Sequence, residues 1–284
     1  MITFSQFLTE SHDMTFEHTC ALIKKDCSRY LHQPQPIFRG INQTSAELDA
    51  GHFYSMPTAR TPKNSGEDFA FMFNAMIDAA FDIRDIRSQA VFAVGDDDTA
   101  SMYGHVNFIF PKNDVSFIWS PEIYDSYVDA GRLFRKISAL LEKQKITFDA
   151  DKMRKVLFKK IKERMGAGTS HDFVNSTAPA RAALESAVDE MIRGINLEPE
   201  FNSSGADFLK ELVAALRQTG QEFYIKNRQL ATALDGHQEI LFYGGSGYYA
   251  IPTNLAYTAV NLAGGRASTY SELYEWTRVQ ILNA

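Results

Sequence analysis

The chain has 284 residues, of which 45% are hydrophobic, 23% charged and 12% aromatic, and its formal net charge is −6. This balance excludes a disordered chain, a collagen-like repeat and a disulfide scaffold, and the length fits one large domain or two modest ones. The longest near-apolar run, 69–81, is interrupted by polar residues and is shorter than the roughly 20 apolar residues that a membrane span needs. The two cysteines lack a partner cluster and the first basic residue is Lys24, so the sequence predicts a cytoplasmic protein with free thiols and no secretory signal.

Local patterns predict a helical beginning, a strand-rich part, a long helical part and a final hairpin. The predicted strands, in chain order, are 36–40, 90–94, 106–110, 115–119, 239–243 and 248–251. The predicted helices are 3–10, 16–30, one capped by Ser65 with Asp68 at its third position and running to Phe81, 98–103, and others within 130–235 that stop at Gly194, Gly220 and Gly236. Glycine and proline residues predict a loop over 51–66.

This order of elements indicates an α+β fold whose sheet is completed from both ends of the chain. We expect residues 1–33 to form an N-terminal helical segment and residues 34–284 to form a single domain. Within that domain, helices from about 130–235 are expected as an insertion beside one β core. The strands at the two ends are apolar enough to be buried yet too short to stand alone.

Several familiar kinds of site are missing from the sequence. The seven histidines are scattered, with neither an HxH nor an HxxxH pair, so no metal site is predicted. The chain contains no Gly-x-Ser-x-Gly elbow, no Walker loop and no dinucleotide-binding Gly-x-Gly-x-x-Gly. The glycine-rich stretch 244–247 lies in a predicted hairpin turn without a following helix, and a phosphate cradle needs that helix.

A few polar residues on strands and their edges remain as candidates for chemistry. Arg39 ends the strand Ile-Phe-Arg-Gly, Arg60 lies in a polar loop, and Glu239 opens the hydrophobic strand Glu-Ile-Leu-Phe-Tyr. An acidic residue at the start of a buried strand is also compatible with a plain edge position. The residue types alone leave both interpretations of Glu239 open.

The succession of these segments resembles the mono-ADP-ribosyltransferase fold over about 120 positions, 36–120 and 222–255. In that family an arginine on an early strand grips NAD and a glutamate on a late strand is catalytic. The resemblance implies that Arg39 and Glu239 take these two roles, with NAD as substrate. The residues implied in NAD binding are Arg39, Gly40, Arg60, Gly95 and Tyr103. The opening Met-Ile-Thr-Phe-Ser-Gln-Phe-Leu-Thr-Glu also looks like the start of many proteins of large tailed bacteriophages.

The chain departs from the family pattern in two places. Val94-Gly95-Asp96 stands where the family has a bracing Ser-Thr-Ser strand, and His237 stands where the family usually has the Glu or Gln that directs the acceptor. The resulting hypothesis is an NAD-dependent transferase that moves ADP-ribose to a host protein or nucleic acid in the host cytoplasm. The alternative is a catalytically inactive phage structural or host-interaction protein with the same fold.

Charge is concentrated in one part of the chain. Residues 131–165 carry 12 basic and 4 acidic side chains, hence +8, which leaves −14 for the rest. One interpretation is the solvated face of a helix, because apolar residues recur there at helical spacing. The other is contact with a polyanion such as nucleic acid, through Lys155, Lys159, Lys160 and Arg164. An enzyme acting on nucleic acid is therefore a third hypothesis.

Overall fold

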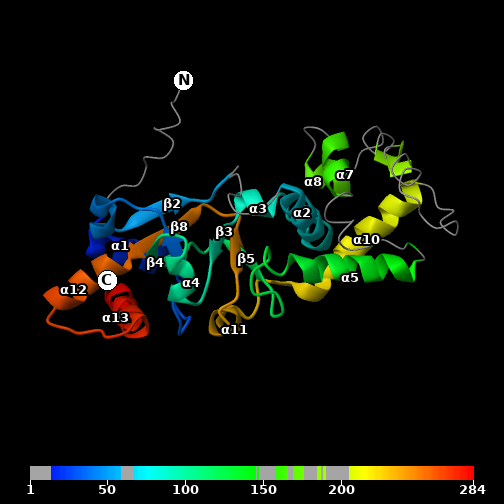
Figure 1. Ribbon diagram of the computed structural model, residues 1–284. Helices are drawn as coiled ribbons and strands as arrows, with labels where there is room; N and C mark the ends of the chain where they lie inside the picture. Colours follow the sequence, from blue (N-terminus) through cyan, green and yellow to red (C-terminus); the bar gives the residue numbers. More distant parts are fainter. Residues whose placement is uncertain are drawn as a thin grey trace, which may run out of the picture. The chain divides into compact units, whose positions relative to one another are not determined.

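The computed structural model describes residues 14–58, 67–144, 146, 158–165, 169–175, 184–186, 188–189 and 205–284. The chain divides into two compact units, each assembled from separate stretches of sequence. Unit 1 takes its described residues from Met1–Pro57, Ala90–Pro121 and Ile225–Ala284, and unit 2 from Thr58–Gln89 and Glu122–Tyr224 (Figure 1). Helices and antiparallel sheets occur together, which confirms the predicted α+β class.

Unit 1 contains two four-stranded antiparallel sheets. The first has the order β1-β4-β8-β2 and the second the order β3-β7-β5-β6. The strands are β1 (Phe38–Ile41), β2 (His52–Ser55), β3 (Val91–Ala93), β4 (His105–Pro111), β5 (Ser116–Trp119), β6 (Ile225–Lys226), β7 (Ile240–Tyr243) and β8 (Gly247–Pro252). The hairpin of β7 and β8 therefore supplies an inner strand to each sheet.

The two sheets are joined at one corner, where β1 meets the end of β3. Phe38 and Val94 exchange backbone hydrogen bonds of 2.8 and 3.0 Å. The six predicted strands all form in unit 1, but they are divided between two sheets. Two further strands were not predicted: β2 falls in the expected loop, and β6 in the expected helical part.

Alternation along the strands gives the first sheet two apolar faces. One face, with Ile109 and Ala250, packs with Phe117 and Phe242 of the second sheet in a shared core. The opposite face packs against the helices of unit 1. These helices are α1 (Phe16–Asp26), α12 (Thr253–Leu262) and α13 (Tyr270–Asn283), while the 3₁₀ helix η1 (Ser45–Asp49), α4 (Asp97–Ser101) and α11 (Leu230–Asp235) connect strands (Figure 1).

Helix α1 differs from the predicted separate N-terminal segment. Its Phe16, Cys20 and Ile23 are buried in the same core as Leu273 and Ile281 of α13. The first predicted helix, 3–10, lies outside the described residues. The described part of the N-terminal region is thus an integral layer of unit 1.

All the regular secondary structure among the described residues of unit 2 is helical. Its helices are α2 (Glu67–Phe81), α3 (Ile86–Gln89), α5 (Ala130–Lys143), α7 (Phe158–Met165), α8 (Ser170–Val174) and α10 (Gly205–Phe223). The unit includes α2 and ends at Tyr224, so it differs in both respects from an insertion over 130–235. Helix α10 continues through Gly220, where a Cβ would lie 2.6 Å from that of Ala80, so this glycine serves close helix packing instead of ending the helix. Among the described residues no helix has the length and apolar character needed to cross a membrane.

The buried thiols of unit 1 are expected to resist modification. Cys20 and Cys27 are 1% and 0% exposed, and the Cys27 thiol donates to the Phe110 carbonyl at 3.2 Å. Burial, aided by Glu17, raises the pKa of Cys20 to about 12, and burial also raises the pKa of Cys27. Because the thiolate is the reactive form, a disulfide reagent at pH 8 should modify neither thiol in the native protein and both in guanidinium chloride. Rapid modification of the native protein would contradict this burial.

Candidate functional site

Of the two residues singled out by the sequence, Arg39 lies on β1 and Glu239 directly precedes β7, and both strands are neighbours of β3. Arg39 follows Phe38, which bridges to Val94 at the end of β3. Glu239 directly precedes β7, whose first residue, Ile240, pairs with Ala93 of β3. Arg39 and Glu239 therefore approach the same end of β3 from its two sides.

Arg39 is half-buried and only partly satisfied by the protein. Its Nη1 donates to the Phe92 carbonyl at 2.5 Å, while its buried Nε has no hydrogen-bond partner among the residues that the structure describes. No carboxylate of the described residues forms an ion pair with it. Burying part of a cation without an anionic partner is unfavourable, so the position is suited to an anionic ligand, which a guanidinium binds with charge-assisted hydrogen bonds.

A polar network extends from Arg39 along the same face of the first sheet. Asn107 stands directly opposite Arg39 in the β1–β4 register, and directly opposed residues share a face. The Asn107 amide donates to Gln43 at 2.9 Å, and the Gln43 amide donates to the Tyr54 hydroxyl at 3.4 Å. Burial, supported by the neighbouring Tyr248, raises the pKa of Tyr54 to about 12, and the charge of Arg39 opposes this shift. The network is therefore within electrostatic reach of the arginine.

Gln43 also lines an open cavity of about 470 Å³ at the end of β1. The cavity is lined by Asn42, Gln43, Thr44, Glu47, Gly104 and His105. Glu47 accepts hydrogen bonds of 2.6 and 2.8 Å from the backbone and side chain of Thr44, which lower its pKa. Ligand pockets commonly have volumes of roughly 300–1,000 Å³, so this cavity has room for part of a dinucleotide.

The surroundings of Glu239 include a histidine that lies close to an aspartate. His237 Nδ1 lies 4.0 Å from Asp96 Oδ1, and His237 adopts a left-handed backbone conformation with φ +54°. Burial acts to raise the pKa of Asp96, but hydrogen bonds from Thr99 and Asp98 outweigh it and lower the pKa. Glu239 itself is half-buried. An acidic group and a histidine thus accompany the predicted catalytic glutamate on the approach to β7.

The two predicted glycines have a packing role in the structure. A Cβ on Gly40 would lie 2.1 Å from the Ala100 carbonyl oxygen of α4, and one on Gly95 would lie 2.0 Å from that of Leu234 in α11. Close backbone approach therefore accounts for both glycines. Tyr103 is 51% exposed just beyond α4.

Other predicted residues fall partly or wholly outside the described structure. Arg60 and Lys155 lie outside the described residues, as do the side chains of Lys160 and Arg164. Lys159 is exposed on α7, and its Nζ lies 4.0 Å from Glu163. This single contact agrees with a solvated helix face and leaves polyanion binding as a prediction.

Sequence reasoning missed Gln43 and Asn107, which have no distinctive motif. Only the β1–β4 register, which opposes Arg39 to Asn107, could have indicated Asn107. Comparisons of the chain with protein-family models, with curated proteins and with solved structures find no match. The assignment of a function therefore depends on the residues and their geometry.

Proposed function

We propose that unit 1 is an NAD-dependent ADP-ribosyltransferase that transfers ADP-ribose from NAD to a host macromolecule. The observation that carries the proposal is the half-buried Arg39, whose Nε has no partner in the described part of the chain. Arg39 lies beside the end of β3 that Glu239 approaches from the other side. The pyrophosphate of NAD is an anion, and it would supply the ion-pair partner that Arg39 lacks among the described residues. The cavity lined by Gln43 and Glu47 offers room for part of the dinucleotide.

The reaction breaks the bond between the nicotinamide nitrogen and ribose C1′ and forms a bond from C1′ to the acceptor. Nicotinamide leaves with the bonding electron pair, and the acceptor loses a proton. The transition state resembles an oxocarbenium ion, as in other glycosyl transfers. In this proposal the Glu239 carboxylate stabilises the positive charge on the ribose, and Arg39 holds the pyrophosphate in place.

NAD binding by the purified chain tests the proposal, with calorimetry as the measurement. Arg39→Gln is expected to weaken NAD binding at least tenfold, because hydrogen bonds to charged groups contribute about 1.5–3 kcal/mol. Arg29→Gln is the matched control, since Arg29 Nη1 also donates to a backbone carbonyl, that of Val115, at 3.1 Å. The control should bind NAD like the unmodified chain.

Two outcomes would count against the transferase. If the unmodified chain fails to bind NAD, the catalytically inactive interaction protein becomes the better hypothesis. If both arginine variants bind NAD equally well, Arg39 does not hold the cofactor. If the chain binds NAD as proposed, incubation with labelled NAD and a host lysate, followed by protease and nuclease digestion, would establish whether the acceptor is protein or nucleic acid.

A further inference from the structure

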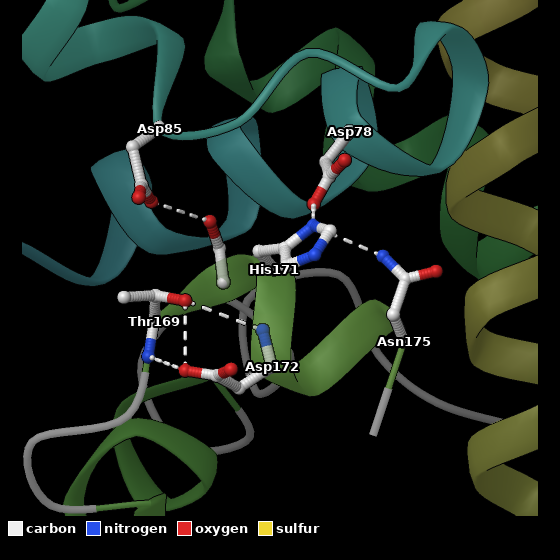
Figure 2. A network of polar contacts seen from close by, with 7 residues as sticks. Asp78, Asp85, Thr169, His171, Asp172 and Asn175 are labelled. Atoms are coloured by element: carbon white, nitrogen blue, oxygen red, sulfur yellow. Dashed lines mark hydrogen bonds and ion pairs between the residues drawn. The ribbon is translucent and has the colours of Figure 1, made fainter. Parts of the chain in front are cut away.

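A histidine and two aspartates of unit 2 converge where α2 ends. Asp78 lies in the last turn of α2, and the Asp82 backbone N–H donates to the Asp78 carbonyl at 2.8 Å just beyond the helix. His171 comes from α8, and its Nδ1 lies 2.7 Å from Asp78 Oδ2 (Figure 2). One ligand-type atom from each of the three residues lies within 4.8 Å of the others. Three potential metal ligands thus meet from segments about 90 residues apart in the chain.

The position of His171 is held by contacts on both sides of it. Ser170 donates to the Asp85 carboxylate at 3.0 Å, and Thr169 caps α8 in a reciprocal arrangement with Asp172 (Figure 2). Two residues after the histidine, the buried Phe173 packs on Phe71 of α2 with ring centroids 5.8 Å apart. The histidine is therefore placed against α2 by its neighbours and not by the Asp78 contact alone.

Asp78 is a buried carboxylate, and one of its two oxygens has no hydrogen-bond partner among the described residues. Its side chain is 0% exposed, and among the described residues Oδ1 has no hydrogen-bond partner. Burial raises its pKa, although the hydrogen bond from His171 acts in the opposite direction. A buried charged group normally has a full set of partners or coordinates a metal. The unpartnered oxygen therefore points to a missing positive ligand.

The contacts of His171 Nδ1 depend on how the Asn175 amide is placed. The Asn175 amide nitrogen lies 3.1 Å from this Nδ1 (Figure 2). A ring nitrogen cannot donate to Asp78 and accept from Asn175 at once. Rotation of the Asn175 amide by about 180° removes this conflict, because it presents an oxygen acceptor to the Nδ1–H. A cation at this site would replace that proton and bind the Nδ1 lone pair.

We propose that Asp78, Asp82 and His171 form a binding site for one divalent transition-metal cation, with Zn²⁺ the best match. One imidazole and two carboxylates suit Zn²⁺, whereas Mg²⁺ and Ca²⁺ favour oxygen ligands throughout. Asp82 is exposed and His171 is partly exposed, so a fourth position on the cation would face solvent. Three protein ligands with one open position is the arrangement of catalytic zinc sites. None of these three ligands is among the residues proposed to bind NAD.

The test is a zinc titration of the full chain after chelator treatment, in competition with a chromophoric chelator. The unmodified chain should bind one equivalent of Zn²⁺, and Co²⁺ in its place should give visible absorption bands. Asp82→Asn and His171→Gln should each weaken Zn²⁺ binding at least tenfold and diminish the Co²⁺ bands. Asn tolerates the left-handed conformation of Asp82, whose φ is +55°, so this variant should keep its fold.

Matched controls come from exposed residues of unit 1. His18→Gln and Asp98→Asn remove the same chemical groups away from the cluster and should leave Zn²⁺ affinity unchanged. Zinc binding that survives both Asp82→Asn and His171→Gln would overturn the proposal, as would the absence of zinc binding in the unmodified chain. A His171→Gln variant that melts earlier without any loss of zinc affinity would reduce the Asp78–His171 contact to a packing interaction and would also overturn it.

Discussion

Gly95→Ala is expected to destabilise unit 1 by about 3 kcal/mol and to lower its melting temperature by roughly 6–12 °C. The added Cβ would lie 2.0 Å from the Leu234 carbonyl oxygen, and both groups belong to backbone that cannot swing away. Either α11 or the turn after β3 would have to move. Gly40→Ala should act in the same direction, because its Cβ would lie 2.1 Å from the Ala100 carbonyl oxygen.

Thermal unfolding followed by circular dichroism would measure these effects. Gly265→Ala is a suitable control in the same unit, since the nearest atoms to its Cβ would be in Val260 at 3.3 Å. That substitution should change the melting temperature by no more than a few degrees. A Gly95→Ala variant that melts with the control would show that α11 does not pack on this turn as closely as described.

Glu239→Gln is expected to slow ADP-ribose transfer by about 100- to 1,000-fold, while NAD affinity changes little. The amide has the same size and can still hydrogen-bond the ribose, but it lacks the charge that stabilises the developing cation. An effect on the rate without an effect on binding marks a contact made chiefly in the transition state. His237→Ala, two residues away, should spare NAD hydrolysis while altering transfer to the acceptor.

Transfer of label from NAD, measured beside calorimetric NAD binding, separates these effects. Glu275→Gln is the control, because Glu275 is a glutamate paired with Arg278 on α13, and it should transfer at the normal rate. Full transfer activity in Glu239→Gln would refute the catalytic assignment. Loss of NAD binding together with activity would instead indicate that Glu239 supports the fold or the bound ground state.

The strands at both ends of the β core were predictable because each is a short apolar run between turn residues. Strand β2 was not, since Gly51 and Pro57 flank it and favour a loop, whereas pairing of His52 with Ala250 draws it into the first sheet. Strand β6 has only two residues and leaves no periodic pattern. Its pairing with Trp119 of β5 is a tertiary event that local sequence does not encode.

The candidate sites show the same difference between features that local sequence reveals and contacts that form only on folding. Arg39 and Glu239 could be selected by residue type and position on a strand. The Asp78–His171 contact could not, because the histidines follow no ligand spacing and the two residues are 93 positions apart. At most, Asp78 and Asp82 at a four-residue spacing, beside the end of an apolar helix, could have drawn attention. Only folding brings the histidine to them.

The shared hairpin of β7 and β8 affects how the protein is made. Because β7 lies between β3 and β5, and β8 between β4 and β2, neither sheet can close before this hairpin leaves the ribosome. More than a hundred residues are synthesised between the end of β5 and the start of β7. During that time strands β1 to β5 expose apolar faces and unpaired edges, which favour aggregation. Early termination of synthesis before residue 240 would therefore leave both sheets open at once.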